Sequence, residues 1–270
     1  MSDLKIVSEI ARKAGQLLTE YQGKLSSLKV ASKTASRDLV TDADLDAEKL
    51  IVALLAEKFP ASGFWSEEAF FEEKDTDIVW CIDPLDGTVN FVQSLPFYAV
   101  SIARITKGVI DLGVVYVPEL DWLFCASEDE RSSLNGELIN VGLTQNLEEA
   151  VLATGFPYRR HLLADNNLEN FNRLFLKQRG VRRMGAAAID LCLVACGRLD
   201  AFWELHLSPW DVAAGAYIVE RAGGVVDTIS SGGDWLRDKN ILSGPLALVE
   251  NLRIELLRDR PKDYPDVGHV

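Results

Sequence analysis

Apolar residues between Leu4 and Tyr21 recur at steps of three and four residues. That spacing gathers them on one face of a helix, so we predict an amphipathic helix near the start of the chain. A second helix is predicted to begin after Thr41, because Asp44 follows three residues later in the pattern of a capping box. Its apolar face continues until Pro60.

Short apolar runs follow these helices and predict strands. The first run, rich in Ile and Val, covers residues 78–82. It is predicted to stop at Asp83-Pro84, because proline has no N–H to donate to a sheet ladder. Three more runs are joined by short polar turns and predict antiparallel hairpins over residues 99–105, 109–117 and 123–126.

The second half alternates between helical and strand patterns, which is typical of a layered α/β unit. The predicted helices cover residues 186–196, 212–222 and 246–257, and the predicted strands cover 201–205 and 224–227. The predicted fold class is therefore α/β (α+β), with an N-terminal part rich in antiparallel hairpins and a smaller α/β C-terminal part. Since no Pro- or Ser-rich linker interrupts the chain, we expect residues 1–270 to form a single two-part domain, divided into about 1–180 and 181–270.

The charge balance narrows the possible partners. The chain has 28 Lys and Arg against 41 Asp and Glu, a formal net charge of −13. It lacks the positive charge that binding to nucleic acid or to anionic lipid requires, so we expect no nucleic acid and no membrane among its partners. The N-terminal residues are too charged for a signal peptide. We therefore expect a cytoplasmic protein with four reduced cysteines.

One segment combines acids with turn residues directly after a predicted strand. With only three histidines in the chain, histidine-rich zinc sites are excluded. In Asp83-Pro84-Leu85-Asp86, two carboxylates flank a rigid proline and the Leu85 carbonyl, and such hard oxygens can converge on one cation. Taken alone, the segment is more typical of a turn than of a metal site.

The chain resembles the inositol monophosphatase family of Mg-dependent, lithium-sensitive phosphomonoesterases over nearly its whole length. The two main motifs are DPLDGTVNF at 83–91 and PWDVAAG at 209–215, which continues through IVERAGG at 218–224. Weaker matches occur in the expected order at 40–44, 66–68 and 134–141. The resemblance implies a layered αβαβα sandwich of the sugar-phosphatase type and a homodimer.

The resemblance also implies a set of metal ligands. These ligands are Glu67, Asp83, the Leu85 carbonyl, Asp86 and Asp211. Without it, Asp211 is more typical of a first-turn helix acid, and Glu67 of an exposed acid. Four converging carboxylates would repel one another in a partly dehydrated pocket unless cations occupied it. Ligation by oxygen alone favours Mg2+, two to three ions by resemblance, with Mn2+ as a possible substitute.

The family pattern assigns roles in hydrolysis by a metal-activated water. Thr88 would orient that water, Asp44 would act as its carboxylate partner and general base, and Glu67 would serve beside them at the first metal. The amides of Gly87 and Thr88 would bind phosphate oxygens. Taken alone, Asp44 is more typical of a first-turn acid stabilised by the helix dipole.

Substrate contacts are implied at a second group of residues. Gly185 and Ala186 match a segment that lies against the substrate ring, Glu204 matches an acid that accepts hydrogen bonds from substrate hydroxyls, and Asp211 is counted with them. Asp190 is a weaker candidate, and Glu68 has no assigned role. Arginines that could touch a second phosphate, although solvated or interface positions are more typical of them, are Arg159, Arg160, Arg182 and Arg183. Two departures from the family are Ser66, where a glycine is common, and Gly155-Phe156-Pro157, where some relatives have a serine.

The predicted activity is Mg-dependent hydrolysis of inositol 1-phosphate, a small-molecule phosphate monoester, to inositol and phosphate, with inhibition by lithium. The same metal core in relatives suits fructose 1,6-bisphosphate, 3′-phosphoadenosine 5′-phosphate or histidinol phosphate. A regulatory, partner-binding protein on this scaffold is the alternative from a different class.

Overall fold

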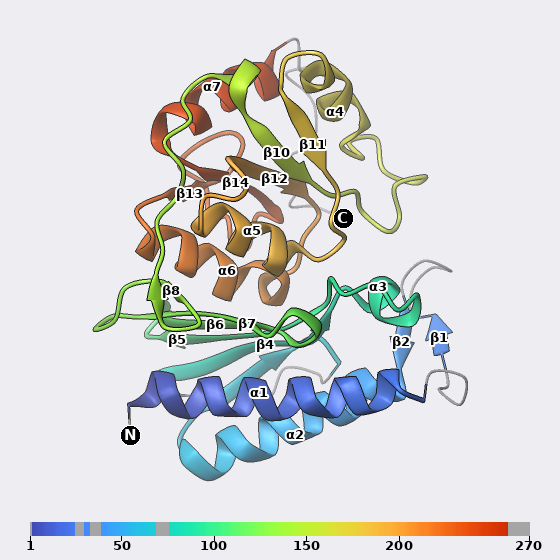
Figure 1. Cartoon of the computed structure of the whole chain (residues 1–270), viewed down its shortest axis with the longest axis vertical. Helices are drawn as coiled ribbons and strands as arrows, with labels where there is room; N and C mark the ends of the chain where they lie inside the picture. The colour runs from blue at the N-terminus through green and yellow to red at the C-terminus, as the bar shows by residue number, and fades with distance from the viewer. Residues whose placement is uncertain (1, 25–29, 33–38, 69–75, 259–270) are drawn as a thin grey trace.

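Two long helices form the first layer of the molecule. The computed structural model describes residues 2–24, 30–32, 39–68 and 76–258. Helices α1 (Asp3–Gln22) and α2 (Asp42–Lys58) lie side by side on the outer face of a large sheet (Figure 1). Thr41 caps α2 in a capping box with Asp44, as its sequence pattern predicts. Both predicted helices are confirmed.

A seven-stranded sheet forms the second layer. Its strands, in spatial order, are β3 (Gly63–Ser66), β4 (Ile78–Asp86), β5 (Ala99–Thr106), β6 (Val109–Val117), β7 (Trp122–Ser127), β8 (Ser133–Leu134) and β9 (Glu137–Leu138). Every neighbouring pair is antiparallel except β3 and β4, which are parallel. The predicted hairpins are therefore confirmed. A separate pair, β1 (Val30–Ser32) and β2 (Leu39–Thr41), precedes α2.

The predicted end of the first strand is wrong in an informative way. β4 continues through Pro84 to Asp86, with Asp83 opposite Ser101 and Asp86 opposite Ala99. Three steps along β4 therefore match two along β5, which is the signature of a β-bulge. The bulge accommodates the proline and leaves both aspartates at the end of β4, the second strand of the sheet. The short helix α3 (Thr88–Val92) follows directly.

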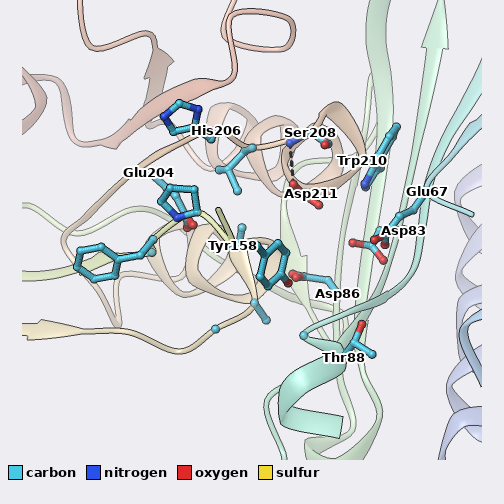
Figure 2. A pocket seen from close by; sticks show the side chains of 18 of the residues that line it. Glu67, Asp83, Asp86, Thr88, Tyr158, Glu204, His206, Ser208, Trp210 and Asp211 are labelled. Atoms are coloured by element: carbon cyan, nitrogen blue, oxygen red, sulfur yellow. Dashed lines mark hydrogen bonds between the residues drawn. The ribbon is translucent and has the colours of Figure 1, made fainter. Parts of the chain in front are cut away.

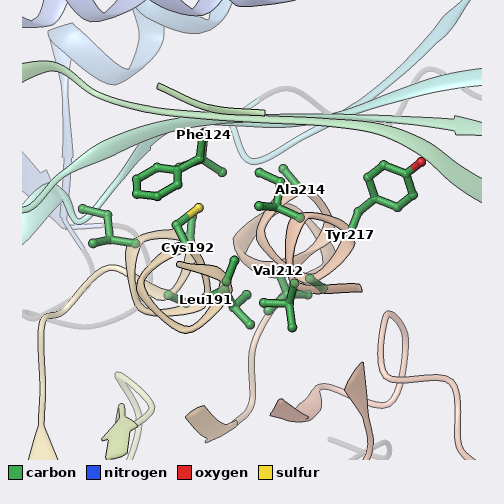
Figure 3. Close-up of a cluster of buried hydrophobic side chains, with 14 of the residues drawn as sticks. Phe124, Leu191, Cys192, Val212, Ala214 and Tyr217 are labelled. Carbon is green, nitrogen blue, oxygen red and sulfur yellow. The ribbon is translucent and has the colours of Figure 1, made fainter. Parts of the chain in front are cut away.

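Two central helices separate the large sheet from a second one. These helices, α5 (Ala187–Ala195) and α6 (Pro209–Arg221), form the third layer (Figure 1). Their apolar faces pack on the large sheet, where Cys192 lies against Phe124 and Ala214 also faces the sheet (Figure 3). All nine residues of α5 are buried. A helix covered on both faces is expected to be apolar all round, and every residue of α5 except Asp190 is apolar.

The last two layers belong to the second half of the chain. The five-stranded sheet has the order β11 (Gly180–Arg182), β10 (Val151–Thr154), β12 (Ala201–Leu205), β14 (Asn240–Gly244), β13 (Val225–Asp227). Helices α4 (Leu168–Phe175) and α7 (Leu246–Leu257) cover its outer face. The five layers confirm the mixed α/β class. The second sheet takes strands from as early as Val151, upstream of the division expected near residue 180.

The remaining described elements are single 3-10 turns at Pro118–Leu120 and Leu147–Glu149. No helix within the described ranges combines the length and apolar character of a membrane span. The four cysteines are unpaired, three of them buried and Cys196 partly so.

Gly113 sets the distance between the large sheet and α6. A β-carbon on Gly113 would lie 2.8 Å from the carbonyl oxygen and 3.2 Å from the Cα of Ala214. We expect Gly113→Ala to lower the free energy of unfolding by about 1–3 kcal/mol, the usual cost of overpacking a rigid contact. Urea unfolding measures this difference, with Gly23→Ala as the control, because a β-carbon on Gly23 meets nothing closer than 3.6 Å. Equal stability of the two variants would contradict the proposed contact.

Candidate active site

A single cavity of about 320 Å³ brings together residues from both halves of the chain. It lies where β4 ends, where α3 and α6 begin and where β12 ends (Figure 2). The predicted site residues that line it are Glu67, Asp83, Leu85, Asp86, Gly87, Thr88, Gly185, Ala186, Glu204 and Asp211. The remaining one, Asp44, lies behind the wall in contact with Thr88.

Backbone amides hold three of the acids in place. Asp83 Oδ1 accepts a hydrogen bond from the Leu85 N–H at 2.9 Å, across the β4 bulge. Asp86 Oδ2 accepts from Ala188 N–H at 2.8 Å, and Asp211 Oδ2 accepts from Ser208 N–H at 2.7 Å (Figure 2). In each of these three acids a backbone N–H holds one carboxylate oxygen, and the other oxygen takes no part in that hydrogen bond.

Asp211 combines the simpler interpretation with the functional one. It is the third residue of α6 and forms a capping box with Ser208. The same bond that caps the helix turns the carboxylate to the wall of the cavity. The two interpretations of this residue are therefore compatible.

The acids raise one another's affinity for protons. Burial raises the pKa of Asp83 well above its ordinary value, and the charges of Glu67, Asp86 and Asp211 raise it further. Burial raises the pKa of Asp86 to about 7, against the opposing effect of the Ala188 amide. Arg183 is the only Lys or Arg among the described lining residues. The cavity therefore concentrates negative charge that its own side chains do not balance.

These acids line one wall but do not meet at a point. Within the described ranges, no three His, Cys, Asp or Glu side chains form a ready-made metal cluster. Their role as metal ligands stays a prediction.

The raised pKa values predict that the protein without added cations loses stability as the pH rises. A group whose folded pKa exceeds its unfolded value is stabilising below the unfolded pKa and loses that contribution as the pH rises through the folded pKa. For Asp86 this window runs from about 4 to about 7. Between pH 5 and pH 8 we expect the free energy of unfolding in a chelator to fall by about 3 kcal/mol. In a chain of this size that loss lowers Tm by roughly 10 °C. Differential scanning calorimetry tests this, and a Tm independent of pH would contradict it.

Thr88 and Asp44 form a buried pair at the edge of the cavity. The Thr88 hydroxyl lies 3.2 Å from Asp44 Oδ1 and 3.2 Å from the Leu85 carbonyl oxygen. The other Asp44 oxygen accepts from the Thr41 amide and hydroxyl, at 2.8 and 2.5 Å. Asp44 is fully buried. A first-turn helix acid thus also reaches the site, which periodicity alone does not reveal.

Gly87 enables the turn between β4 and α3. Its φ of 91° is in the left-handed region, and a β-carbon there would lie 2.8 Å from the Phe97 carbonyl oxygen. Only glycine meets both demands. The turn starts α3 at Thr88, so that Gly87 and Thr88 lie at the cavity wall with the first residues of a helix behind them.

Glu204 forms the opposite side of the cavity. It is buried at the end of β12, and burial raises its pKa to about 8 while Arg183 opposes the shift. A β-carbon on Gly155 would lie only 2.1 Å from the Glu204 carboxylate oxygens. Gly155 therefore makes room for this acid. Asp190 is buried nearby, where the Glu204 charge raises its pKa beyond the effect of burial.

Several predicted contacts fall outside the cavity, and several unpredicted ones fall inside it. Among the described candidates, the lining does not include Asp190, Arg159, Arg160 or Arg182, nor does it include Glu68, which has no assigned role. It does include unpredicted residues with polar or aromatic side chains, namely Tyr158, His206, Ser208 and Trp210. Tyr158 lies one residue beyond the segment that departs from the family pattern, and His206 is one of only three histidines, but no local spacing points to either.

Comparison with known proteins agrees with this architecture. The model of the inositol monophosphatase family matches residues 2–261. The chain is 42% identical over 246 residues to Nus factor SuhB of Pseudomonas aeruginosa, covering 89% of this chain and 90% of that protein. The structure of inositol monophosphatase from Anabaena (Nostoc) superimposes with a TM-score of 0.86 at 35% identity, covering 96% of each chain. The extragenic suppressor protein suhB of Bartonella henselae gives 0.90 at 37% identity, covering 95% of this chain and 98% of the other. The chain belongs to the inositol monophosphatase family.

Proposed function

We propose that the protein is a Mg-dependent phosphomonoesterase that hydrolyses inositol 1-phosphate. One observation carries the proposal: a single cavity has four acids on one wall and the buried carboxylate Glu204 on the opposite side. The acid wall suits a metal-bound phosphate, and Glu204 suits a polyol hydroxyl. Membership of the family and likeness to the Anabaena inositol monophosphatase support the same activity.

The donor set fits magnesium. Glu67, Asp83, Asp86, Asp211 and the Leu85 carbonyl offer only oxygen atoms, which hard cations prefer. Two to three divalent ions would also neutralise the repulsion that raises the carboxylate pKa values. When bound, such ions lower the pKa of water and offset the charge of a phosphate. Mn2+ is the expected substitute.

The chain's own groups would then prepare the reaction. Because the Thr88 hydroxyl donates to Asp44, its oxygen is left to accept a hydrogen bond from the attacking water. Asp44 would receive the proton through this pair as general base. The amides of Gly87 and Thr88 would bind phosphate oxygens, and Glu67 would assist in placing the water.

The cavity favours a monophosphate of a polyol over the substrates of some relatives. Glu204 would accept hydrogen bonds from the hydroxyls, with Gly185, Ala186 and Asp211 near the ring. A bisphosphate needs a second cationic site. Arg183 is the only Lys or Arg in the described lining, and it faces three acids, Asp86, Asp190 and Glu204.

Phosphate release from a substrate panel tests the proposal. The panel is inositol 1-phosphate, fructose 1,6-bisphosphate, 3′-phosphoadenosine 5′-phosphate and histidinol phosphate, each with and without Mg2+. We expect the highest kcat/KM for inositol 1-phosphate, no turnover without metal, and inhibition by lithium. A higher kcat/KM for any other member would overturn the choice of substrate.

The names of relatives favour a second candidate function. Proteins 37–42% identical to this chain are called Nus factor SuhB, which suggests a transcription-related role for this chain as well. The net charge of −13 favours a protein partner over direct contact with nucleic acid. Sedimentation of the chain with a transcription complex from its own cell tests this role, and absence of co-sedimentation would contradict it.

We also propose that the protein is a cytoplasmic homodimer. Sedimentation equilibrium measures its mass and so tests the dimer.

A further inference from the structure

A loop over residues 155–167 begins at the end of β10, and its first four residues line the cavity. Its two ends are joined, because the Asn167 side-chain amide donates to the Gly155 carbonyl at 2.6 Å and to Thr154 Oγ1 at 2.8 Å. Asn167 Oδ1 accepts from the Trp203 ring N–H at 2.8 Å. Asn167 is 1% exposed. The base of the loop is thus fixed to β10 and β12.

This loop places Tyr158 in the cavity. In Figure 2 the phenol points toward Asp86, and Glu204 lies on the other side of the ring. The position agrees with the electrostatics, since the charges of Asp211, Asp86, Glu67 and Asp83 all act on the Tyr158 hydroxyl. Tyr158 therefore stands between the wall proposed to hold phosphate and the acid proposed to hold the polyol. The residue remains 45% exposed, so bound substrate could cover it further.

His206 holds the same loop down from the end of β12. Its Nε2 lies 2.7 Å from the Asp165 carbonyl oxygen, which can only accept, so the ring N–H donates. The backbone at His206 has a φ of 64°, in the left-handed region that a non-glycine residue adopts at a cost. That conformation directs the ring to the loop instead of letting the chain continue along the strand. His206 also lines the cavity.

We propose that Tyr158 is a substrate-binding residue that contacts the bound polyol phosphate, and that His206 is the positioning residue that holds its loop in place. The substrate in this proposal rests on the function proposed above. The phenol would donate a hydrogen bond to a phosphate or hydroxyl oxygen, and its ring would pack on the carbon face of the polyol. His206 would act only through the loop.

Steady-state kinetics of Tyr158 variants test the contact. For inositol 1-phosphate we expect Tyr158→Phe, which loses only the hydrogen bond, to raise KM about threefold. Tyr158→Ala, which loses the hydrogen bond and the ring contact, is expected to raise KM about tenfold. For propyl phosphate, which has no polyol hydroxyls, the change is expected to be smaller, and kcat should stay within about twofold of the wild type. A lower KM in Tyr158→Ala would show that the ring obstructs the site, and equal KM values would also overturn the proposal.

His206→Asn tests the positioning role. Asparagine tolerates a left-handed backbone but does not reach the Asp165 carbonyl, and His161→Asn, in the same loop but outside the cavity lining, is the matched control. We expect faster amide hydrogen exchange over residues 155–166 and a higher KM in His206→Asn alone, at unchanged kcat. Unchanged hydrogen exchange would overturn the positioning role of His206.

The two proposals fail in different ways. A wild-type protein that hydrolyses neither inositol 1-phosphate nor propyl phosphate with Mg2+ contradicts the proposed function. The hydrogen-exchange experiment needs no metal or substrate, so it still decides the positioning role of His206. If the wild type binds inositol 1-phosphate without turnover, calorimetric Kd values replace KM. The same order of affinities is then expected, wild type above Tyr158→Phe above Tyr158→Ala, and equal Kd values would overturn the contact.

Discussion

Replacement of Asp83 by asparagine is expected to abolish Mg2+-dependent phosphatase activity. Asp83 lies at the bulge of β4, and the charges of Glu67, Asp86 and Asp211 all act on it. It is therefore the acid best placed to share cations with the others. We expect kcat/KM to fall more than about 100-fold, beyond the 10- to 100-fold that loss of a mere supporting partner costs. The measurement is phosphate release from inositol 1-phosphate over a titration of Mg2+.

The Asp83→Asn variant is not expected to unfold. The asparagine oxygen can still accept from the Leu85 N–H, which preserves the bulge. Removing one charge also relieves repulsion, so Tm in a chelator at pH 8 should equal or exceed that of the wild type. Asp77→Asn, in the exposed residue just before β4, is the matched control with wild-type activity expected. Wild-type turnover by Asp83→Asn at saturating Mg2+ would refute the proposed metal site.

Local patterns are sufficient to predict α2 and most of β4, the elements that carry Asp44 and Asp83. The capping box at Thr41 and Asp44 places α2, and the apolar run before Asp83 places β4, because both signals lie within a few neighbouring residues. The bulge was missed, since a proline normally ends a ladder and only pairing with β5 shows that the strand resumes. What a strand does after a proline depends on a partner elsewhere in the chain.

The loop over residues 155–167 illustrates what local patterns cannot predict. β10 has only four residues, and its parallel partner β12 lies nearly fifty residues further along the chain. The bond between His206 and Asp165 likewise joins segments 41 residues apart. No periodicity within either segment encodes these pairings. Residues such as Tyr158 enter the site through tertiary structure alone, and the expected division near residue 180 falls beyond the start of the second sheet for the same reason.

Two of the candidate site acids also cap helices. Asp44 and Asp211 each occupy the third position of a helix and each complete a capping box. A cap requires one carboxylate oxygen at the helix end, which fixes the side chain with little remaining freedom. The second oxygen of each can then act at the site without further ordering. The helix-cap interpretation and the proposed site role of each acid are therefore compatible.

Replacement of Asp44 by asparagine is expected to lower kcat by about 10²- to 10⁴-fold, the usual contribution of a general base. The asparagine keeps an oxygen that can accept from Thr41 but cannot take up a proton, and its NH2 would face the Thr88 hydroxyl and reverse that hydrogen bond. Pre-steady-state phosphate release from inositol 1-phosphate at saturating Mg2+ measures the effect. Asp42→Asn, in the same first turn, is the matched control.

Because Thr88 and Asp44 would act as one unit, Thr88→Val combined with Asp44→Asn should lower kcat no more than the worse single variant does. Additive losses would show that the two residues act separately, and an unchanged kcat in Asp44→Asn would leave the carboxylate with the helix cap as its only role.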